Sequence, residues 1–314
     1  MKRDVADVIK FLERSDKSMA QDKPQYGGQA VIEGVMMKGK EWLAIAVRRP
    51  DEEITVKTEK LDSISDKLPF LKWPFIRGVR VLIESMVIGM KAITFSANEA
   101  LDEEEEEELT FWEMLLSIVV AFGLAVLLFI AFPAFVVNLV QPYIGSNIIL
   151  NLVEGLVKVS AFMGYILVIS QMKDIKRIFQ YHGAEHVTIH AYENGDELTV
   201  ENARKYSPLH PRCGTNFIFV VIIISIIFFS FFGRPAFLKR ILTHLALLPV
   251  IAGTGYEVIK RAGGEKVNPL IAVLAKPGLW LQKLTTRPPS DDQIEVAIAS
   301  LEAVLSQEKE EKSA

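Results

Sequence analysis

The chain has 314 residues, of which 50% are hydrophobic and one is a cysteine, and its mean hydropathy is +0.25. This apolar composition is typical of a membrane protein, and a single cysteine excludes an intrachain disulfide. The net charge is −4, and the acidic run at residues 102–108 contributes −7 of it, so the other residues sum to +3. Such a balance argues against a DNA-binding protein.

The N-terminal third of the chain predicts a small α+β head. Residues 1–25 form a polar segment without the apolar core of a signal peptide, so we expect them to stay in the cytosol. Apolar residues at strand spacing follow in residues 31–56, with turn residues at Gly39 and Pro50, and predict a short β-meander. Residues 26–100, which end in a helix, are therefore predicted to be cytosolic.

Residues 74–100 predict this amphipathic helix. At about 100° per residue, four charged side chains fall in one narrow stripe, and the remaining surface is apolar. They are Arg77, Arg80, Glu84 and Lys91. Two interpretations are open: a helix buried in the head or in a helix bundle, or a helix on the membrane surface with basic residues among lipid headgroups.

Four apolar stretches approach or exceed the length that crosses a bilayer, which is about 20 residues. They lie at residues 114–140, 148–172, 216–233 and 241–259. We therefore expect an α-helical integral membrane protein with about four transmembrane helices in two hairpins, at residues 111–172 and 216–260. Residues 101–110 contain the acidic run and are predicted to be a solvated linker before the first span.

The distribution of basic residues predicts the orientation of these spans. Lys173, Lys176 and Arg177 follow the second span, whereas the link between the first two spans has no Lys or Arg. The loop at residues 173–215 and both termini are therefore predicted to be cytosolic. Three basic residues in the other loop oppose this assignment: Arg234, Lys239 and Arg240. The C-terminal segment, residues 261–314, predicts one amphipathic helix.

Ionisable side chains inside the spans predict polar contacts within the bundle. Glu154 and Lys158 lie one helical turn apart in the second span, and we expect this pair to face the bundle interior. His244, in the fourth span, is expected to be a packed and hydrogen-bonded core residue.

Three of the five histidines lie close together, at His182, His186 and His190. The second span is expected to continue through them as one helix and to stop at Asn194–Gly195. On that helix the three imidazoles share a face, and neutral imidazoles one turn apart are good ligands for Zn²⁺. Because a straight helix separates His182 from His190 by about 12 Å, one ion can use His186 with either neighbour but not all three.

Glu185 stands directly before His186, which gives the pattern His182-x-x-Glu185-His186. This pattern is an inverted form of the zinc-protease motif, in which the glutamate is a general base. Glu185 is therefore the candidate catalytic residue. A catalytic zinc needs a third protein ligand, and the sequence offers Glu193, Glu201, His210, Cys213 and Glu257.

His210 and Cys213 lie three residues apart in a loop before the third span. A thiolate is an excellent zinc ligand, and this loop can fold back onto the histidine helix because both adjoining spans reach the same membrane face. The ligands of a divalent ion, expected to be Zn²⁺, are thus drawn from His182, His186, His190, His210 and Cys213. The alternatives are solvated histidines beside a lone buried cysteine, or nucleophilic catalysis by Cys213.

Three segments resemble the YqhQ family of multi-pass bacterial membrane proteins. They are GGQAVIEGVMMKG near the N-terminus, YHGAEHVTIHAYE in the centre and HPRCGTNF before the third span. The resemblance covers roughly residues 26–288 and implies a metal-dependent enzyme in the bacterial inner membrane. In many bacteria the family's gene lies beside genes for translation factors, which implies a role in protein synthesis or membrane-protein biogenesis.

Two hypotheses about function remain. One is a metal-dependent hydrolase at the inner leaflet that acts on a peptide or a lipid, with Glu185 as the base. The other is a non-enzymatic partner of the ribosome or the protein-translocation machinery, in which the His/Cys cluster is a closed structural zinc site. Coordination separates them, because three protein ligands and an open position are typical of catalysis, and four ligands of structure.

Overall fold

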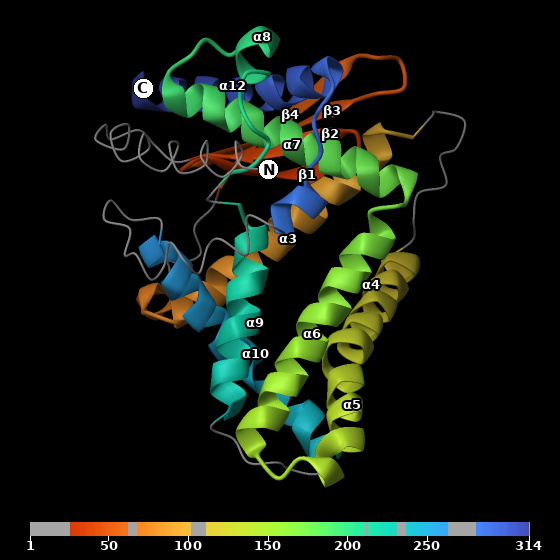
Figure 1. Cartoon of the computed structure of the whole chain (residues 1–314). Helices are drawn as coiled ribbons and strands as arrows, with labels where there is room; N and C mark the ends of the chain where they lie inside the picture. The colour runs from red at the N-terminus through yellow and green to blue at the C-terminus, as the bar shows by residue number, and fades with distance from the viewer. Residues whose placement is uncertain are drawn as a thin grey trace.

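The computed structural model is mostly helical and contains one small antiparallel sheet (Figure 1). Its described residues are 26–61, 68–101, 111–210, 213–230, 237–262 and 281–313. The predicted N-terminal polar segment and nearly all of the acidic linker fall outside these ranges. One group of helices surrounds the sheet and forms the head, and a second group extends away from it.

The predicted β-meander is confirmed as a four-stranded antiparallel sheet in sequential order. Its strands are β1 Gly27–Val31, β2 Gly34–Lys38, β3 Trp42–Arg48 and β4 Ile54–Lys60. Between β1 and β2 the chain turns at residues 32–33, where Glu33 adopts a φ of 50°. The sequence gives little sign of this turn, because no Gly, Pro or Asn stands at either of its two positions.

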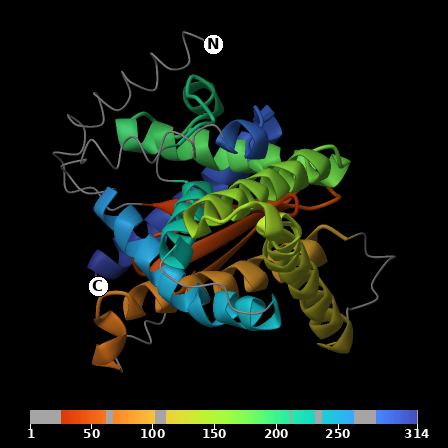
Figure 2. The same ribbon diagram turned by 60° about the horizontal axis from the view of Figure 1, so that its bottom comes forward.

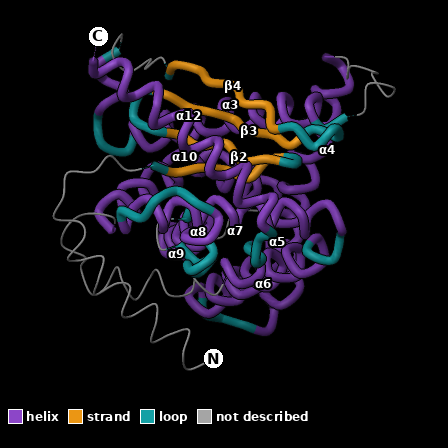
Figure 3. Tube along the Cα trace, turned by 90° about the horizontal axis from the view of Figure 1, so that it is seen from above, coloured by secondary structure: helices purple, strands orange, loops and turns teal. Residues whose placement is uncertain are grey.

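Helices cover both faces of the sheet (Figure 2). They are α3 Ile76–Glu99 on one face, and α7 Lys173–Asn194 and α12 Asp291–Ser313 on the other. Alternate side chains of β3 point to opposite faces, so Leu43 and Ile45 pack against α3 while Ala44 packs against α7 and α12. Seen from above, the strands lie side by side in one layer (Figure 3).

The C-terminal helix α12 is present as predicted, and it packs onto the sheet. A capping contact begins it, in which the Ser290 backbone N–H donates to Gln293 Oε1 at 3.0 Å. Ile294 and Leu301 are buried in the core that α12 shares with the sheet and α7. Ser300 donates to the Ala44 carbonyl at 3.0 Å, so the helix and β3 are also joined by a hydrogen bond.

The expectation of one continuous helix from the second span through the histidines is wrong. The helix α6, Asn147–Ile169, ends before Ser170, and α7 begins after Met172, whose ψ of 139° is extended. This break lets α7 turn and lie along the sheet, where its apolar residues are buried against the sheet and α12. The predicted end of α7 is correct, since Gly195 caps it in the left-handed region with a φ of 80°.

Three helical segments in the described residues are long and apolar enough to cross a membrane. They are Leu115–Tyr143, Asn147–Ile169 and Phe237–Val258, and a fourth apolar stretch, Phe217–Phe229, is shorter. The first contains α4 Phe111–Val126, the π-helical segment η3 Leu127–Ala131, α5 Phe132–Val140 and the short turn η4 Gln141–Tyr143. Phe217–Phe229 lies within α9 Thr215–Ser230, and Phe237–Val258 lies within α10 Phe237–Ala262. Shorter helices in the described residues include η1 Pro69–Lys72 and α8 Val200–Ala203, and residues 281–285 are also helical.

The interior of these apolar helices holds the predicted polar pair. Glu154 Oε1 lies 3.0 Å from Lys158 Nζ and 2.9 Å from His244 Nε2, and its other oxygen pairs with Arg240. All four side chains are buried. The expected inward orientation of Glu154 and Lys158 and the expected packing of His244 are therefore confirmed.

Candidate metal centre

The helix α7 carries the site and is buried along most of its second half, from Tyr181 to Ala191. It runs without a break through Gly183, where the chain at Arg287 passes so closely that a Cβ would collide with the Arg287 carbonyl oxygen. The Arg287 backbone N–H donates to the Phe179 carbonyl at 2.9 Å, so residues 285–287 lie along the helix. Glycine is thus required here by close approach rather than by a bend in the helix.

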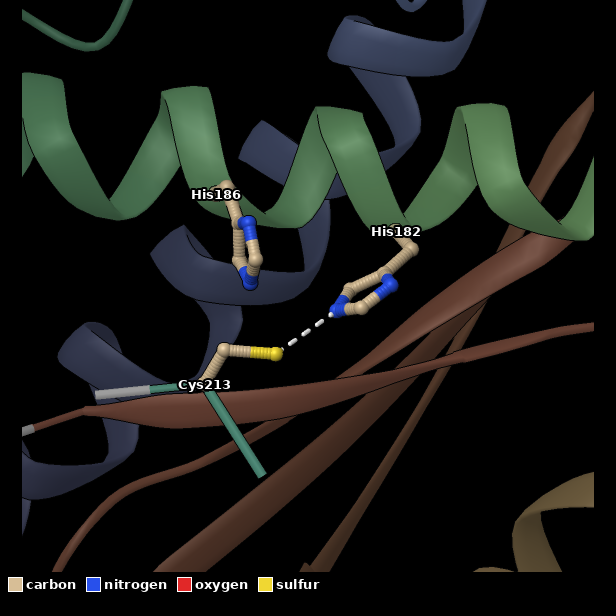
Figure 4. Close-up of side chains that lie close together, drawn as sticks. All are labelled: His182, His186 and Cys213. Atoms are coloured by element: carbon tan, nitrogen blue, oxygen red, sulfur yellow. Dashed lines mark hydrogen bonds between the residues drawn. The ribbon is translucent and has the colours of Figure 1, made fainter. Parts of the chain in front are cut away.

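His182, His186 and Cys213 form a first group of possible ligands, called site one below. One donor atom from each residue lies within 4.8 Å of the other two. His182 Nε2 is 3.2 Å from Cys213 Sγ, and Figure 4 shows both histidines directed from α7 toward this sulfur. The loop that precedes α9 therefore folds back onto the histidine helix, as the sequence predicts.

Both histidines of site one are held through their second ring nitrogen. His182 Nδ1 lies 2.8 Å from the Thr285 carbonyl oxygen, and His186 Nδ1 lies 2.5 Å from the Pro208 carbonyl oxygen. A carbonyl only accepts, so each Nδ1 carries the proton and each Nε2 carries the lone pair. Histidines that bind metals in proteins are held in this way, so the residues of site one fit a metal ion.

His190, Glu193 and His210 form a second group, called site two below, and their donor atoms also lie within 4.8 Å of one another. The His210 ring is 4.5 Å from the His190 ring and 5.5 Å from the His186 ring, measured between centroids. The five predicted ligands therefore all lie in one region, but divided between two groups. His182 and His190 belong to different groups, as expected from the helical rise that places them about 12 Å apart.

Burial keeps two of these imidazoles, His186 and His210, neutral. It lowers the pKa of His186 well below its usual value, with a further contribution from the nearby His182. It also lowers the pKa of His210 to about 4. Near pH 7 both rings are therefore in the neutral form that binds metals. Burial raises the pKa of the Cys213 thiol, so a cation that binds there must displace its proton.

Glu185 lies outside both groups and faces β1. The residue is 6% exposed, and the Gly28 backbone lies against its side chain. Burial raises the pKa of Glu185 to about 7, an effect that His182 and the Gly28 N–H partly offset. A Cβ at residue 28 would stand 3.0 Å from Cδ of Glu185, so Gly28 allows the strand to approach this carboxylate.

Two of the other offered ligands lie elsewhere. Glu257 bonds Arg77 of α3, with its Oε1 2.6 Å from Nε of the arginine. Glu201 is exposed on α8 and belongs to neither group. The sequence does not reveal the groups that hold the ligands. Three are backbone carbonyls, of Pro208, Leu209 and Thr285, which bond the ring nitrogens of the histidines. The fourth is Gln282, whose side chain bonds the His210 backbone. Backbone carbonyls leave no side-chain signal, so only the fold could reveal them.

Comparison with known proteins places the chain in a family. A family model described as "Protein of unknown function (DUF1385)" matches residues 73–307. The chain is 37% identical over 300 residues to the uncharacterized protein YqhQ of Bacillus subtilis (strain 168), which covers 90% of this chain and 92% of that protein. No solved structure matches the chain. The resemblance read from the sequence is confirmed, and the chain belongs to the YqhQ (DUF1385) family of uncharacterised proteins.

Proposed function

We propose that the chain is a metal-dependent hydrolase of the bacterial inner membrane, with a divalent ion at site one and Glu185 as general base. The observation that carries the proposal is the convergence of two carbonyl-held imidazoles and a thiol within 4.8 Å. Three protein ligands and an open position are typical of catalytic zinc. A bound divalent ion such as Zn²⁺ would supply a Lewis acid and favour deprotonation of water at neutral pH.

Glu185 has the contacts expected of a base beside such a site. It precedes the ligand His186, and its side chain packs against the backbone of Gly28. It is also close enough to His182 and Cys213 for their charges to influence its protonation. A buried carboxylate in this position can accept a proton from water and later return it to a leaving group.

The substrate class follows from where site one lies. Cys213 is two residues before Thr215, the first residue of the apolar helix α9, so the site lies where the head meets the apolar helices. A group at this junction can reach a peptide or a lipid at the membrane surface. With the head in the cytosol, as the basic residues after the second span indicate, this surface is the inner leaflet.

A second candidate function is a structural metal site in a membrane-protein biogenesis factor. It is favoured by the way site one joins separate parts of the chain: α7, the residues Pro208 and Cys213, and the segment that contains Thr285. An ion there would fasten the head, and its surface could then contact the ribosome or the protein-translocation machinery. Catalysis would play no part.

Glu185→Gln separates the two functions. This substitution keeps the shape and removes the basic carboxylate, so a hydrolase should keep its metal and lose about 10²- to 10⁴-fold in turnover. The measurements are metal content of the purified protein and complementation of a deletion strain. His186→Ala should lose metal and fail to complement under either function, and Glu201→Gln, on the exposed α8, should retain both properties.

The outcomes are distinct. A Glu185→Gln variant that retains metal and complements fully would end the hydrolase proposal and leave the structural one in place. Equal metal content in the native protein and His186→Ala would refute both, since both require an ion at site one.

A further inference from the structure

Site two has the donor set of a metal site in its own right. Two imidazoles and a carboxylate, from His190, His210 and Glu193, place one donor atom each within 4.8 Å of one another. Two histidines with one glutamate is an established ligand set for catalytic zinc and also suits other borderline divalent ions. His190 and His210 are 3% and 4% exposed, so these are not solvated surface histidines.

Two ligands of site two are held in place, one through its second ring nitrogen and one through its backbone. His190 Nε2 lies 2.9 Å from the Leu209 carbonyl oxygen, so Nε2 carries the proton and Nδ1 the lone pair. His210 is fixed through its backbone, because its N–H donates to Gln282 Oε1 at 2.9 Å and its carbonyl accepts from Gln282 Nε2 at 2.8 Å. These contacts orient the His190 ring and fix the backbone of His210 before any ligand arrives.

The separation of Glu193 from His210 suits an ion between them better than a direct bond. Glu193 Oε2 lies 3.5 Å from His210 Nε2. A charge-assisted hydrogen bond between nitrogen and oxygen is shorter, about 2.7–2.9 Å. Two ligands that share a tetrahedral ion at about 2.1 Å each stand about 3.4 Å apart. The observed distance matches the second geometry.

We propose that site two binds a second divalent transition-metal ion, so that the loaded protein holds two ions per chain. The two sites are neighbours, since the His186 and His210 rings are 5.5 Å apart, yet they share no ligand. His210 and Cys213, only three positions apart in the sequence, belong to different sites. This inference goes beyond the proposed hydrolase and stands without it, since it concerns ion binding alone.

Co²⁺ titration of the purified full-length protein tests the proposal, because a thiolate gives bound Co²⁺ a charge-transfer absorption that a His₂Glu site lacks. The native protein should bind two Co²⁺ ions, one of them with this band. Glu193→Ala should bind one ion and keep the band. Cys213→Ser should bind one ion without it. Glu197→Gln, an exposed glutamate just beyond α7, is the matched control and should bind two.

Several results would overturn the second site. They are saturation of the native protein at one ion, two tightly bound ions in Glu193→Ala, or loss of both ions from a folded Glu193→Ala. If Glu193→Ala loses its helical circular dichroism, the shape-preserving variant Glu193→Gln takes its place. It should lower the affinity for one of the two ions by more than about ten-fold. Unchanged affinity for both ions in Glu193→Gln would contradict the proposal. No arm requires an activity, so failure here differs from failure of the hydrolase proposal.

Discussion

Gly183 lies where α7 touches the segment that holds His182, and it leaves no room for a side chain. We predict that Gly183→Ala destabilises the protein by about 1–3 kcal/mol, the usual cost of overpacking a core, although alanine is the better helix former. The added methyl group must push back the Arg287 backbone, and with it the Thr285 carbonyl that holds His182 Nδ1. Thermal unfolding of the detergent-solubilised protein measures the loss.

Gly164→Ala is the matched control. Gly164 lies within α6, and a Cβ there meets nothing within 4 Å, so this substitution should leave the melting temperature unchanged or raise it slightly. Equal melting temperatures for Gly183→Ala and the native protein would show that the Arg287 segment yields easily and does not orient His182.

At the scale of single residues, the sequence predicts the candidate metal ligands but not which of the two sites each belongs to. Helix geometry alone separates His182 from His190, because the rise per residue limits what one ion can reach. Assigning His210 to one group and Cys213 to the other needs the path of the loop, which no spacing rule gives. The carbonyl partners are equally hidden, since any residue can supply one.

The helix α3 shows how a correct pattern can support two structures. Within its charged stripe, Arg77 bonds Glu257 of α10 and Arg80 bonds Glu84 of α3 itself. Lys91, in the same stripe, is exposed. The interpretation that places this helix on the membrane surface stays a prediction. Only part of the apolar surface is covered, since Ile88 and Phe95 pack against the sheet while Ile83 and Met86 are 56% and 63% exposed. Periodicity identifies the two faces, but the neighbours decide which one is covered.

Glu154 joins two of the apolar helices and offsets two basic groups, Lys158 and Arg240. We predict that Glu154→Gln destabilises the protein by about 3–5 kcal/mol, the usual cost of removing one partner of a buried ion pair. The reason is that both cations then stay buried without a carboxylate from α6. Yield and melting temperature in detergent measure the effect, and Glu113→Gln, at the exposed start of α4, should change neither. A Glu154→Gln protein as stable as the native one would show that this cluster contributes no net stability.

On the scale of the whole molecule, the head is assembled from segments that lie far apart in the sequence. The strands at residues 27–60, the helix α7 and the helix α12 share one core, and Glu308 near the C-terminus bonds Tyr26 at 2.7 Å. Except for the turn that divides β1 from β2, these elements could be predicted from their own periodicity, because strands and helices are local patterns. Their assembly could not, because packing between distant segments leaves no local pattern. The break after Ser170, which turns α7 onto the sheet, was hidden for the same reason.

The head and the link at residues 141–146 lie at opposite ends of the apolar helices (Figure 1). If these helices cross the inner membrane with the head in the cytosol, Tyr143, which is 87% exposed, should face outward. In a Cys213→Ser background, we predict that a cysteine replacing Tyr143 reacts with a membrane-impermeant maleimide in intact cells. A cysteine replacing Glu197, exposed on the head, should react only after the membrane is permeabilised. The reverse labelling would place both proposed metal sites outside the cytosol, and equal labelling of both positions in intact cells would show that the helices do not span the membrane. Lys173, Lys176 and Arg177 stand at the start of α7, next to the head end of α6, whereas the 141–146 link has no basic residue. We therefore expect that in intact cells only Tyr143→Cys is labelled.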